Sequence, residues 1–540
     1  MCGILCLVQY GGRQVDQDIA DSCLKTLIPR GPDRLLSRTM KINNCVEIFM
    51  GFTRLAIMDT SDEGQQPFVK NGNMTVCNGE IYNYEKIAAD LDYKMKTNCD
   101  CEVLLELFES TKFKTCIKDK ISGEFAVVYY DSKLERLYAV RDRYGVRPLY
   151  YGYNRSTQTI GFASELKALH SIMEHVEQVN PDKIYKLNLS ANIISGITTD
   201  VSDLPIVSNY FRYKYTITNS SIETIHDKIN TLFTAAVKNR LVSDRPMGFL
   251  LSGGLDSSLI VAIATKILGP DKIVCFSIGI DGSPDVVAAK KVVEFLGIKN
   301  HHIVPFDVVT GFEALPDVIR VVETYDITTI RASTPQYLMA KYISLNTDIK
   351  VLLSGEGSDE IHGSYRYFRD APNSTQFHNE SIRLLRELFY FDNKRTDRTM
   401  AAHGLEVRVP FLDFDYVNFI MGINPEFLMY TNKQMEKQIV RDSFKGYLPA
   451  EILYRSKEAF SDAVSNSETN WAQYIQEQVT HITNDTTYSF NTPKTSDAVY
   501  FRNIFNSIYP NRDHIIPHYW LPRFQSIPIF DPSATILKCY

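Results

Sequence analysis

The sequence lacks the features that mark nucleic-acid-binding and membrane proteins. Among 540 residues, 58 Lys and Arg are set against 64 Asp and Glu, so the basic excess of a nucleic-acid-binding protein is missing. No apolar run approaches the roughly 18 residues that cross a membrane. The N-terminal stretch MCGILCLVQY is apolar but has no basic leader, so we predict no signal peptide and a soluble, cytoplasmic protein.

Cysteine is present without the spacing of a metal or redox site. Eight of the ten cysteines lie in the first 116 residues, and no pair is spaced as CxxC. Without a secretory signal, we expect reduced thiols that pack as small hydrophobic groups.

Histidine is missing from the start of the chain, where the first one is His170. A Cys–His dyad is therefore nearly excluded there, and a cysteine nucleophile needs another base. Removal of Met1 would give Cys2 a free α-amine, which titrates at about 7.7–8.0 and suits a general base. The alternative is an ordinary N-terminal thiol.

The chain changes character near residue 205. Before it, short apolar segments alternate with turns, among them a hairpin over 125–131 and 136–142 and a further strand over 145–152. Residues 205–220 show no period and read as a linker. Beyond them strands and amphipathic helices alternate, which predicts a parallel, doubly wound sheet, followed from about residue 365 by a mostly helical part.

Two segments of the first half could surround a nucleophile. RLAIMD (54–59) and CNGEIYN (77–83) each end an apolar strand with polar groups. Asn78 and Gly79 could offer an amide and a backbone N–H to an oxyanion, although Asn-Gly is also a common turn. Arg54 could clamp a carboxylate, and Asp100 could hold an ammonium.

Two further motifs follow predicted strands of the second half. SGGLDSS (252–258) is a Gly-rich turn opening a helix, where backbone N–H groups cradle phosphate; it is not a Walker loop. SGEGSDE (354–360) crowds three carboxylates, Glu356, Asp359 and Glu360, into one turn. Such repulsion favours a cation, and Mg²⁺ is the natural partner of this turn; Asp256 of the first motif could also bind Mg²⁺. A solvated acidic loop is the alternative.

Other polar segments are less specific. ITTIRASTPQYLMAKYI (327–343) predicts a loop entering a helix, with Ser333 or Thr334 as N-cap, Pro335 in the first turn and Arg331 free to meet an anion. Arg395 and Lys457 lie in mixed polar runs that, taken alone, read as surface charges. The pair His301–His302 is expected to be structural.

These motifs together resemble the glutamine-hydrolysing asparagine synthetase family along essentially the whole chain. MCGI, RLAIMD, CNGEIYN, CDCEVL and RDRYGVRPLYY resemble a class II glutamine amidotransferase domain. LLSGGLDSS, SIGIDGSPD, TTIRASTPQYLM, LLSGEGSDE, AAHGLEVRVPFLD, EKQIVRDSF, YRSKEAFSD and NTPKTSDAVYFRNIF resemble a synthetase domain. The resemblance implies an α+β N-terminal-nucleophile domain (αββα sandwich, 1–204), a linker (205–220), and an α/β doubly wound PP-loop ATP pyrophosphatase domain with a largely helical C-terminal part (221–540).

The resemblance also implies roles. Cys2 would attack glutamine, whose ammonia would be channelled to a second site where Mg-ATP activates aspartate as β-aspartyl-AMP. The catalytic residues would be Cys2, Asn78, Gly79, Glu356 and Lys457. Glutamine would contact Arg54, Leu55, Ala56, Ile57, Met58, Asn78, Gly79, Glu80 and Asp100. ATP would contact Leu251, Ser252, Gly253, Gly254, Leu255, Asp256, Ser257, Ile278, Ser354 and Gly355. Aspartate would contact Arg331, Asp392 and Arg395, and Mg²⁺ would bind Asp256 and Asp359.

The chain departs from the family pattern at Pro29, Thr53 and Ser364, none of which removes a residue assigned above. The partners implied are small molecules and, from the resemblance alone, a second copy in a homodimer. Alternatives are a relative that amidates another acid or closes a β-lactam, a PP-loop enzyme acting on RNA, and a non-catalytic regulator. The presence of Cys2, Asp256 and Lys457 speaks against the regulator.

Overall fold

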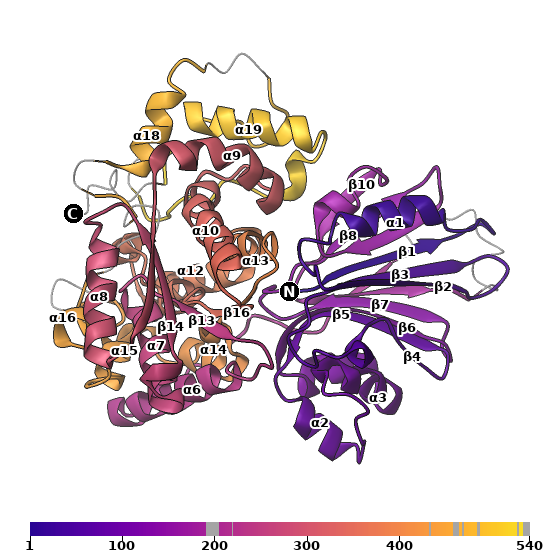
Figure 1. Cartoon of the computed structure of the whole chain (residues 1–540), viewed down its shortest axis with the longest axis horizontal. Helices are drawn as coiled ribbons and strands as arrows, with labels where there is room; N and C mark the ends of the chain where they lie inside the picture. The colour runs from indigo at the N-terminus through magenta and orange to yellow at the C-terminus, as the bar shows by residue number, and fades with distance from the viewer. Residues whose placement is uncertain are drawn as a thin grey trace. The chain divides into compact units, whose positions relative to one another are not determined.

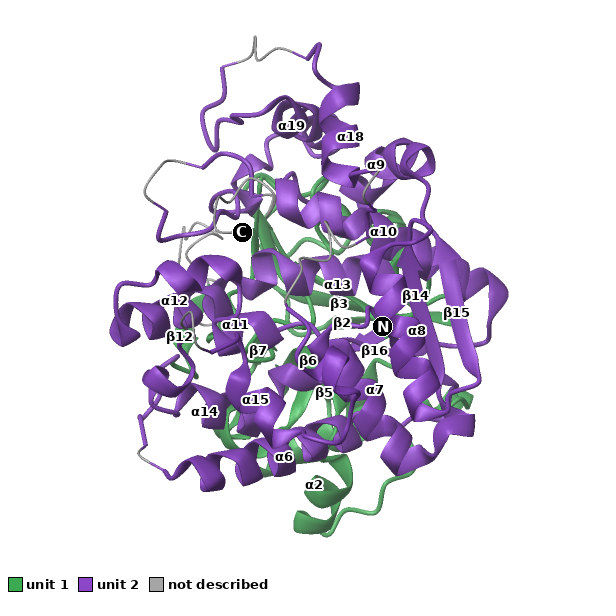
Figure 2. Cartoon of the chain, turned by 90° about the vertical axis from the view of Figure 1, so that its left-hand side faces the viewer, with its two compact units in different colours: residues 1–212, 401–406 green, residues 213–400, 407–540 purple. Residues whose placement is uncertain are grey.

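The computed structural model describes residues 1–190, 205–218, 220–430, 434–456, 464–466, 469–482, 487–525 and 529–532. They form two compact units, one of residues 1–212 with 401–406 and one of 213–400 with 407–540 (Figure 2). The division at residue 212 falls inside the segment 205–220. That segment also contains a strand, β12 (Ile206–Asn209), which pairs with β11.

Unit 1 contains two six-stranded sheets, in the orders β10-β8-β9-β1-β3-β2 and β12-β11-β7-β6-β5-β4 (Figure 1). Neighbouring strands in both sheets are antiparallel. The strands not yet given are β1 (Gly3–Gln9), β2 (Arg34–Lys41), β3 (Glu47–Arg54), β4 (Phe68–Lys70), β5 (Asn73–Ile81), β6 (Gly123–Asp131), β7 (Arg136–Arg141), β8 (Tyr150–Asn154), β9 (Thr159–Ala163), β10 (His175–Gln178) and β11 (Lys183–Asn188).

The two sheets pack face to face and are covered outside by helices. Alternate side chains of β1, such as Ile4, Cys6 and Val8, share one buried core with residues of β5, β6 and β11. Helix α1 (Gln17–Lys25) packs on β1 and β3, and α2 (Tyr84–Asp90) and α3 (Val103–Ser110) close a second core against β5 and β6. A short helix, α4 (Phe113–Thr115), follows α3. This is the αββα sandwich that the resemblance implied.

Most of the local predictions in unit 1 are confirmed. The hairpin expected at 125–131 and 136–142 is β6 and β7. The further strand expected from residue 145 is wrong at its start, because β8 begins only at Tyr150. Residues 145–147 instead follow a turn, and the backbone N–H groups of Val146 and Arg147 donate to the Asp142 carboxylate.

Unit 2 is built on a five-stranded sheet in the order β15-β14-β13-β16-β17. The strands are β13 (Met247–Leu250), β14 (Val274–Gly279), β15 (Asn300–Pro305), β16 (Val351–Leu353) and β17 (Glu406–Arg408). Strand β13 pairs in parallel with β14 on one side and β16 on the other. The sheet is thus extended on both sides of the central strand β13, which confirms the doubly wound sheet. Where the direction of winding reverses, a crevice forms at the carboxyl ends of the strands.

Helices surround this sheet and make up the rest of unit 2. Those between the strands are α6 (Ile222–Asn239), α7 (Leu255–Leu268), α8 (Pro284–Leu296), α9 (Val308–Val322), α10 (Ile327–Asn346), α11 (Ser358–His362), α12 (Ser374–Glu387) and α13 (Asp392–Ala401). Those after β17 are α14 (Phe414–Met421), α15 (Gln438–Ser443), α16 (Ala450–Leu453), α18 (Trp471–Gln478) and α19 (Ser496–Ile508). The helical C-terminal part is as predicted.

The segment at 327–343 is helical throughout, so the loop expected there is wrong. Helix α10 starts at Ile327 with Asp326 as its N-cap, and Pro335 lies inside it. Proline cannot donate to the carbonyl four residues before it. That carbonyl, of Arg331, instead accepts a hydrogen bond of 2.9 Å from Trp471 Nε1. A tertiary contact therefore satisfies the group that the sequence pattern suggested would end the helix.

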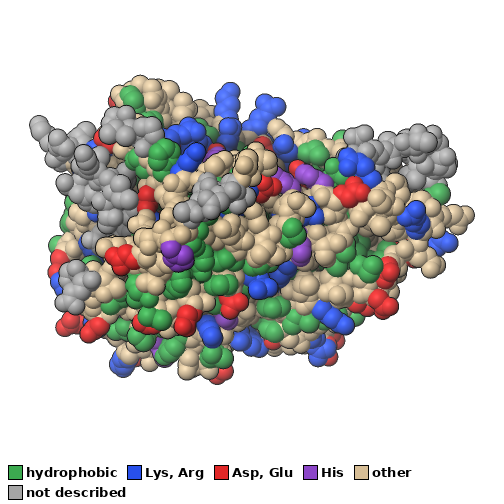
Figure 3. All heavy atoms as spheres, turned by 90° about the horizontal axis from the view of Figure 1, so that it is seen from above, with side chains coloured by type: hydrophobic (Ala, Val, Ile, Leu, Met, Phe, Trp, Pro, Cys, Tyr) green, Lys and Arg blue, Asp and Glu red, His purple; other side chains and the backbone are tan. Residues whose placement is uncertain are grey.

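Two surface findings bear on function. In the described residues no helix has the length and apolar character needed to cross a bilayer. On the face drawn in Figure 3, acidic and basic side chains are interspersed rather than gathered by sign.

Candidate functional sites

The first site forms where β1 begins beside the end of β3. The antiparallel register pairs Gly3 with Thr53, so Cys2 lies at the end of β3, where the chain continues into Leu55. The Leu55 N–H points at Cys2 Sγ at 3.4 Å. Arg30, fully buried, donates from Nε to the Cys2 carbonyl at 2.8 Å and from Nη1 to Glu165 at 2.7 Å. Arg30 therefore fixes the backbone of the candidate nucleophile, a role that sequence reasoning missed.

Asn78, on β5, faces Cys2 across the sandwich. Its Oδ1 accepts a hydrogen bond of 2.9 Å from the Cys2 backbone nitrogen. Its Nδ2 is buried and has no hydrogen-bond partner among the described residues. A buried donor without a partner costs free energy of about 1–3 kcal/mol, so the amide is held ready for an acceptor that arrives with a ligand. This is the property required of an oxyanion-hole donor.

Gly79 follows with φ of 140°. A Cβ there would overlap the Glu124 carbonyl oxygen on β6, so only glycine fits. The structure thus places Asn78 against Cys2, with Gly79 next to it on β5.

The residues predicted to hold glutamine lie around this centre. The segment 55–58 is buried, and Asp33 anchors it by accepting the Ala56 N–H at 2.8 Å. Arg54 is buried and donates to the carbonyls of Asp59 and Ser61. Asp100 is buried and accepts from the Ile81 N–H at 2.6 Å. In this structure Arg54 thus holds the loop that follows β3, and Asp100 holds the end of β5.

Two pKa values describe the N-terminus. Burial raises the pKa of the Cys2 thiol to about 11, so at neutral pH the thiol is protonated and needs a base. Burial also lowers the pKa of the Met1 ammonium, which lies 3.9 Å from Glu406, to about 6. While Met1 is present, the Cys2 nitrogen is an amide and cannot act as that base. The free α-amine arises only when Met1 is removed.

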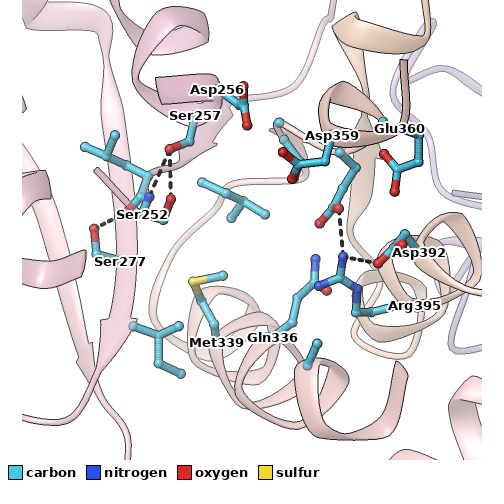
Figure 4. A pocket seen from close by; sticks show the side chains of 18 of the residues that line it. Ser252, Asp256, Ser257, Ser277, Gln336, Met339, Asp359, Glu360, Asp392 and Arg395 are labelled. Carbon is cyan, nitrogen blue, oxygen red and sulfur yellow. Dashed lines mark hydrogen bonds and ion pairs between the residues drawn. The ribbon is translucent and has the colours of Figure 1, made fainter. Parts of the chain in front are cut away.

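The second site is a cavity of about 180 Å³ at the carboxyl edge of the unit 2 sheet (Figure 4). The turn between β13 and α7 forms one wall. Gly253 has φ of 72°, and a Cβ there would overlap the backbone of α8. Ser252 and Ser257 join by their hydroxyls at 3.1 Å, and Gly254 is the N-cap of α7. The backbone N–H groups opening this helix suit a phosphate.

Most residues predicted for ATP line the cavity, namely Leu251, Ser252, Asp256, Ser257, Ile278, Ser354 and Gly355. Gly254 and Leu255 line an adjoining cavity of about 70 Å³. Ser277, beside Ile278, bonds to His301 at 2.7 Å. Burial lowers the pKa of His301 to about 4, so this histidine is neutral and braces the wall.

Charged groups occupy the opposite wall of the cavity. Arg395, on α13, donates from Nη2 to Glu356 and to Asp392, both at 2.7 Å. Burial alone would lower the pKa of Arg395, but the carboxylates of Glu356 and Asp392 outweigh burial and raise it. Its Nε is buried without a partner among the described residues. Glu360 accepts from Tyr365 Oη at 2.6 Å, and burial raises its pKa well above the usual range.

Arg331 is not at this site, which corrects its assignment to aspartate binding. It donates to Asp497 at 2.6 Å and to Asp531 at 2.8 Å and does not line the cavity. The reason is that Arg331 lies on a different face of α10 from the residues that line the cavity. Those residues are spaced by three or four positions: Thr328, Ala332, Gln336 and Met339. The Gln336 Oε1 is buried without a partner in the described residues, and sequence reasoning missed it.

Lys437 is a further cation of this site; its segment, EKQIVRDSF, belongs to the resemblance, but sequence reasoning gave the lysine no role. Lys437 Nζ lies 2.6 and 2.7 Å from the two carboxylate oxygens of Asp256 and 2.8 Å from Asp359 Oδ1. Among the described residues no group of three or more His, Cys, Asp and Glu side chains could hold a metal. Lys457 lies outside the described residues.

Comparison with known proteins covers the whole chain. Residues 1–236 match the glutamine amidotransferase domain family, and residues 228–378 and 369–520 match the asparagine synthase family. A probable glutamine-hydrolysing asparagine synthetase of Acanthamoeba polyphaga mimivirus is 58% identical over 552 residues, covering 99% of this chain and 100% of its own. The glutamine-hydrolysing asparagine synthetase of Homo sapiens is 38% identical over 572 residues, covering 100% of this chain and 99% of its own. The chain therefore belongs to the glutamine-hydrolysing asparagine synthetase family.

Proposed function

We propose that the chain releases ammonia from glutamine at the site in unit 1 and uses it to amidate aspartate at the site in unit 2, with ATP as the activating substrate. The observation that carries this proposal is the pair of unpartnered buried donors at the two centres, Asn78 Nδ2 beside Cys2 and Arg395 Nε beside Glu356. Each is held where an anionic or carbonyl oxygen of a substrate would satisfy it.

At the first site, Cys2 Sγ would attack the side-chain amide carbon of glutamine. The α-amine of Cys2, free once Met1 is gone, takes the thiol proton and passes it to the leaving nitrogen. Asn78 Nδ2 and the Gly79 N–H would hold the oxygen that becomes negative. Ammonia departs, and water then breaks the thioester to give glutamate and restore the thiol. Arg54, Leu55, Glu80 and Asp100 would hold glutamine.

At the second site, an oxygen of the aspartate β-carboxylate would attack the α-phosphorus of ATP, and the bond to the bridging oxygen breaks to release pyrophosphate. Ammonia attacks the acyl carbon of the adenylate, AMP leaves with the carboxylate oxygen, and the nitrogen loses a proton. We assign aspartate binding to Arg395 and Asp392 and the adenylate step to Glu356. Lys457 is assigned to pyrophosphate from the resemblance.

The family uses ATP, and Mg²⁺ is the ion we propose with it. Carboxylate oxygens of Asp256 and Asp359 converge on a single point, each within 2.6–2.8 Å of the Lys437 ammonium. Mg²⁺ is commonly bound by one or two carboxylates together with substrate phosphates, so the donor set fits. Bound there, the ion would offset negative charge on the phosphates.

We further propose residues 1–204 as the glutaminase domain, 205–220 as the linker and 221–540 as the synthetase domain. A cytoplasmic location agrees with the cysteines of the described residues, all of which are free thiols. A homodimer is supported by the resemblance alone, and sedimentation of the purified chain would test it.

The direct test is a product assay on purified chain whose N-terminus has been checked by mass. Glutamine, aspartate and Mg-ATP should give asparagine, glutamate, AMP and pyrophosphate in equal amounts. ADP and phosphate in place of AMP would contradict the adenylate. A panel of other acids serves as control, and a faster reaction with one of them would assign a different acceptor.

A further inference from the structure

We propose that Lys437 is a positioning residue that holds Asp256 and Asp359 together and keeps free Mg²⁺ out of their site until the phosphates of ATP arrive. The inference rests on the proposed function, since it takes these two carboxylates as the magnesium ligands. It adds an order of binding, in which the metal enters with the nucleotide and not before it.

The geometry places Lys437 at the centre of the site. Its ammonium contacts both oxygens of Asp256 and one of Asp359. The two aspartates lie in the first turns of different helices, α7 after β13 and α11 after β16, 103 positions apart in the chain by their numbers 256 and 359. Two carboxylates this close repel one another, so the ammonium between them stabilises the arrangement that a metal ion needs.

The local fold keeps this lysine in place at a cost. Lys437 is only 4% exposed, and its φ of 56° is in the left-handed region. A non-glycine residue there carries backbone strain. Its neighbour Glu436 is bound by Arg441 through both its side chain, at 2.6 Å, and its carbonyl, at 2.8 Å. A strained backbone held by its surroundings is typical of a functional position.

The charges explain the order of binding. Two carboxylates and one ammonium sum to −1, whereas Mg²⁺ added beside the ammonium would make the sum +1. Joining the ammonium would put two cations side by side, and displacing it would leave the buried Lys437 ammonium without its two carboxylate partners, which is costly, so the free ion gains little by either route. The phosphates of ATP reverse this, because they offer anions both to the metal and to the displaced ammonium. Lys437 also lines the adjoining cavity with Ser252, Gly254 and Arg455, next to the turn proposed for phosphate.

The test measures metal binding rather than turnover. We would follow free Mn²⁺ by electron paramagnetic resonance, with MnCl₂ alone and with α,β-methylene-ATP, in the wild-type chain and in Lys437→Met and Lys437→Arg. We expect Mn²⁺ alone to bind Lys437→Met at least about tenfold more tightly than wild type. Lys437→Arg, which keeps the charge, should resemble wild type. Adding the nucleotide should tighten Mn²⁺ binding at least about tenfold in wild type and much less in Lys437→Met.

Thermal unfolding gives a second readout and a matched control. Without nucleotide, MgCl₂ should leave the Tm of wild type unchanged and raise the lowered Tm of Lys437→Met. Arg240→Met removes another buried cation, which lies 3.0 Å from Asp413. It should lower the Tm without any recovery in MgCl₂.

Equal affinity of wild type and Lys437→Met for Mn²⁺ alone would overturn the inference. If Lys437→Met does not fold, wild type decides, because Mn²⁺ binding that is as tight without the nucleotide as with it overturns the gating role. Asparagine formation by the wild-type chain tests the proposed function separately from either result.

Discussion

The two sites differ in the kind of group from which they are built. In unit 1 the centre consists of a thiol, an amide and backbone N–H groups, contributed by Cys2, Asn78, Leu55 and Gly79. In unit 2 the cavity wall carries Glu356, Asp359, Glu360, Asp392 and Arg395, with Lys437 beside it. The amide bond of glutamine is neutral and gains charge only in the transition state, so neutral donors suffice. ATP and aspartate are anions from the start, and the acids on this wall add to the negative charge, so the site needs cations: Arg395, Lys437 and the Mg²⁺ that we propose enters with ATP.

The largest effect is expected from Cys2→Ala. Without the thiol, glutamine-dependent asparagine formation should fall by about 10⁴-fold or more, while the reaction with ammonium salts continues. The measurement is asparagine formed from each nitrogen donor. Cys6→Ala is the matched control, because Cys6 is a fully buried thiol on the adjoining strand and both reactions should survive. Continued formation of asparagine from glutamine by Cys2→Ala would contradict the assignment of glutamine hydrolysis to the site in unit 1.

A smaller loss is expected from Asn78→Ala. Removing one oxyanion donor costs about 10²–10³ in kcat, so glutamate release should fall by this amount. The ammonia-dependent reaction should be unchanged. Asn73→Ala, on the same strand, removes the oxygen that accepts a hydrogen bond from the Ser132 N–H and should spare both reactions. A rise in the glutamine KM at unchanged kcat would instead assign Asn78 to ground-state binding.

Arg395→Lys should act on the other site. The lysine keeps the charge but not the planar fork that contacts Glu356 and Asp392. We expect the aspartate kcat/KM to fall by about 10–100-fold, on the order of 1.4–3 kcal/mol, with glutamate release unaffected.

Arg331→Lys is the companion variant for this comparison. It weakens the pairing with Asp497 and Asp531, so it should lower the Tm and leave the aspartate KM unchanged. If Arg331→Lys raises that KM and spares the Tm, our correction of Arg331 is mistaken.

The smallest effect is the pH dependence of the first site. The base must be unprotonated, so glutaminase activity is present above the pKa of the Cys2 amine and is lost as pH falls through it. Burial lowers the pKa of the Met1 ammonium to about 6, and the same burial should hold the Cys2 amine below its ordinary value of about 7.7–8.0. Glutamine kcat/KM should change less than about twofold between pH 8 and 7 and fall steeply below pH 6. A midpoint above pH 8 would contradict this.

The sequence was most informative where one short segment carries both the fold and the chemistry. SGGLDSS predicted a strand, a glycine turn and a helix N-terminus at once, and the structure has all three. CNGEIYN likewise placed Asn78 and Gly79 on a strand beside Cys2. These motifs position their groups by backbone geometry, which is local and therefore visible in the pattern.

The sequence was least informative where distant segments meet. Lys437 reaches Asp256 across 181 residues, and Arg30 reaches Cys2 from a turn after α1. Neither contact leaves a local trace. Arg331 is predicted to lie in a loop before a helix because Pro335 suggests a helix start, whereas Trp471 satisfies the carbonyl that the proline leaves without a donor and the helix includes Arg331. Only tertiary structure fixes the phase of α10.

The most direct test of the account follows the amide nitrogen of glutamine and a β-carboxylate oxygen of aspartate into the products. The purified chain would be given glutamine labelled with ¹⁵N in its amide, aspartate labelled with ¹⁸O in its β-carboxyl, and Mg-ATP, with products read by mass spectrometry. The account predicts asparagine that carries ¹⁵N and AMP that carries one ¹⁸O. Unlabelled AMP, or ¹⁸O found in inorganic phosphate, would contradict the adenylate, and asparagine without ¹⁵N would contradict the use of glutamine nitrogen.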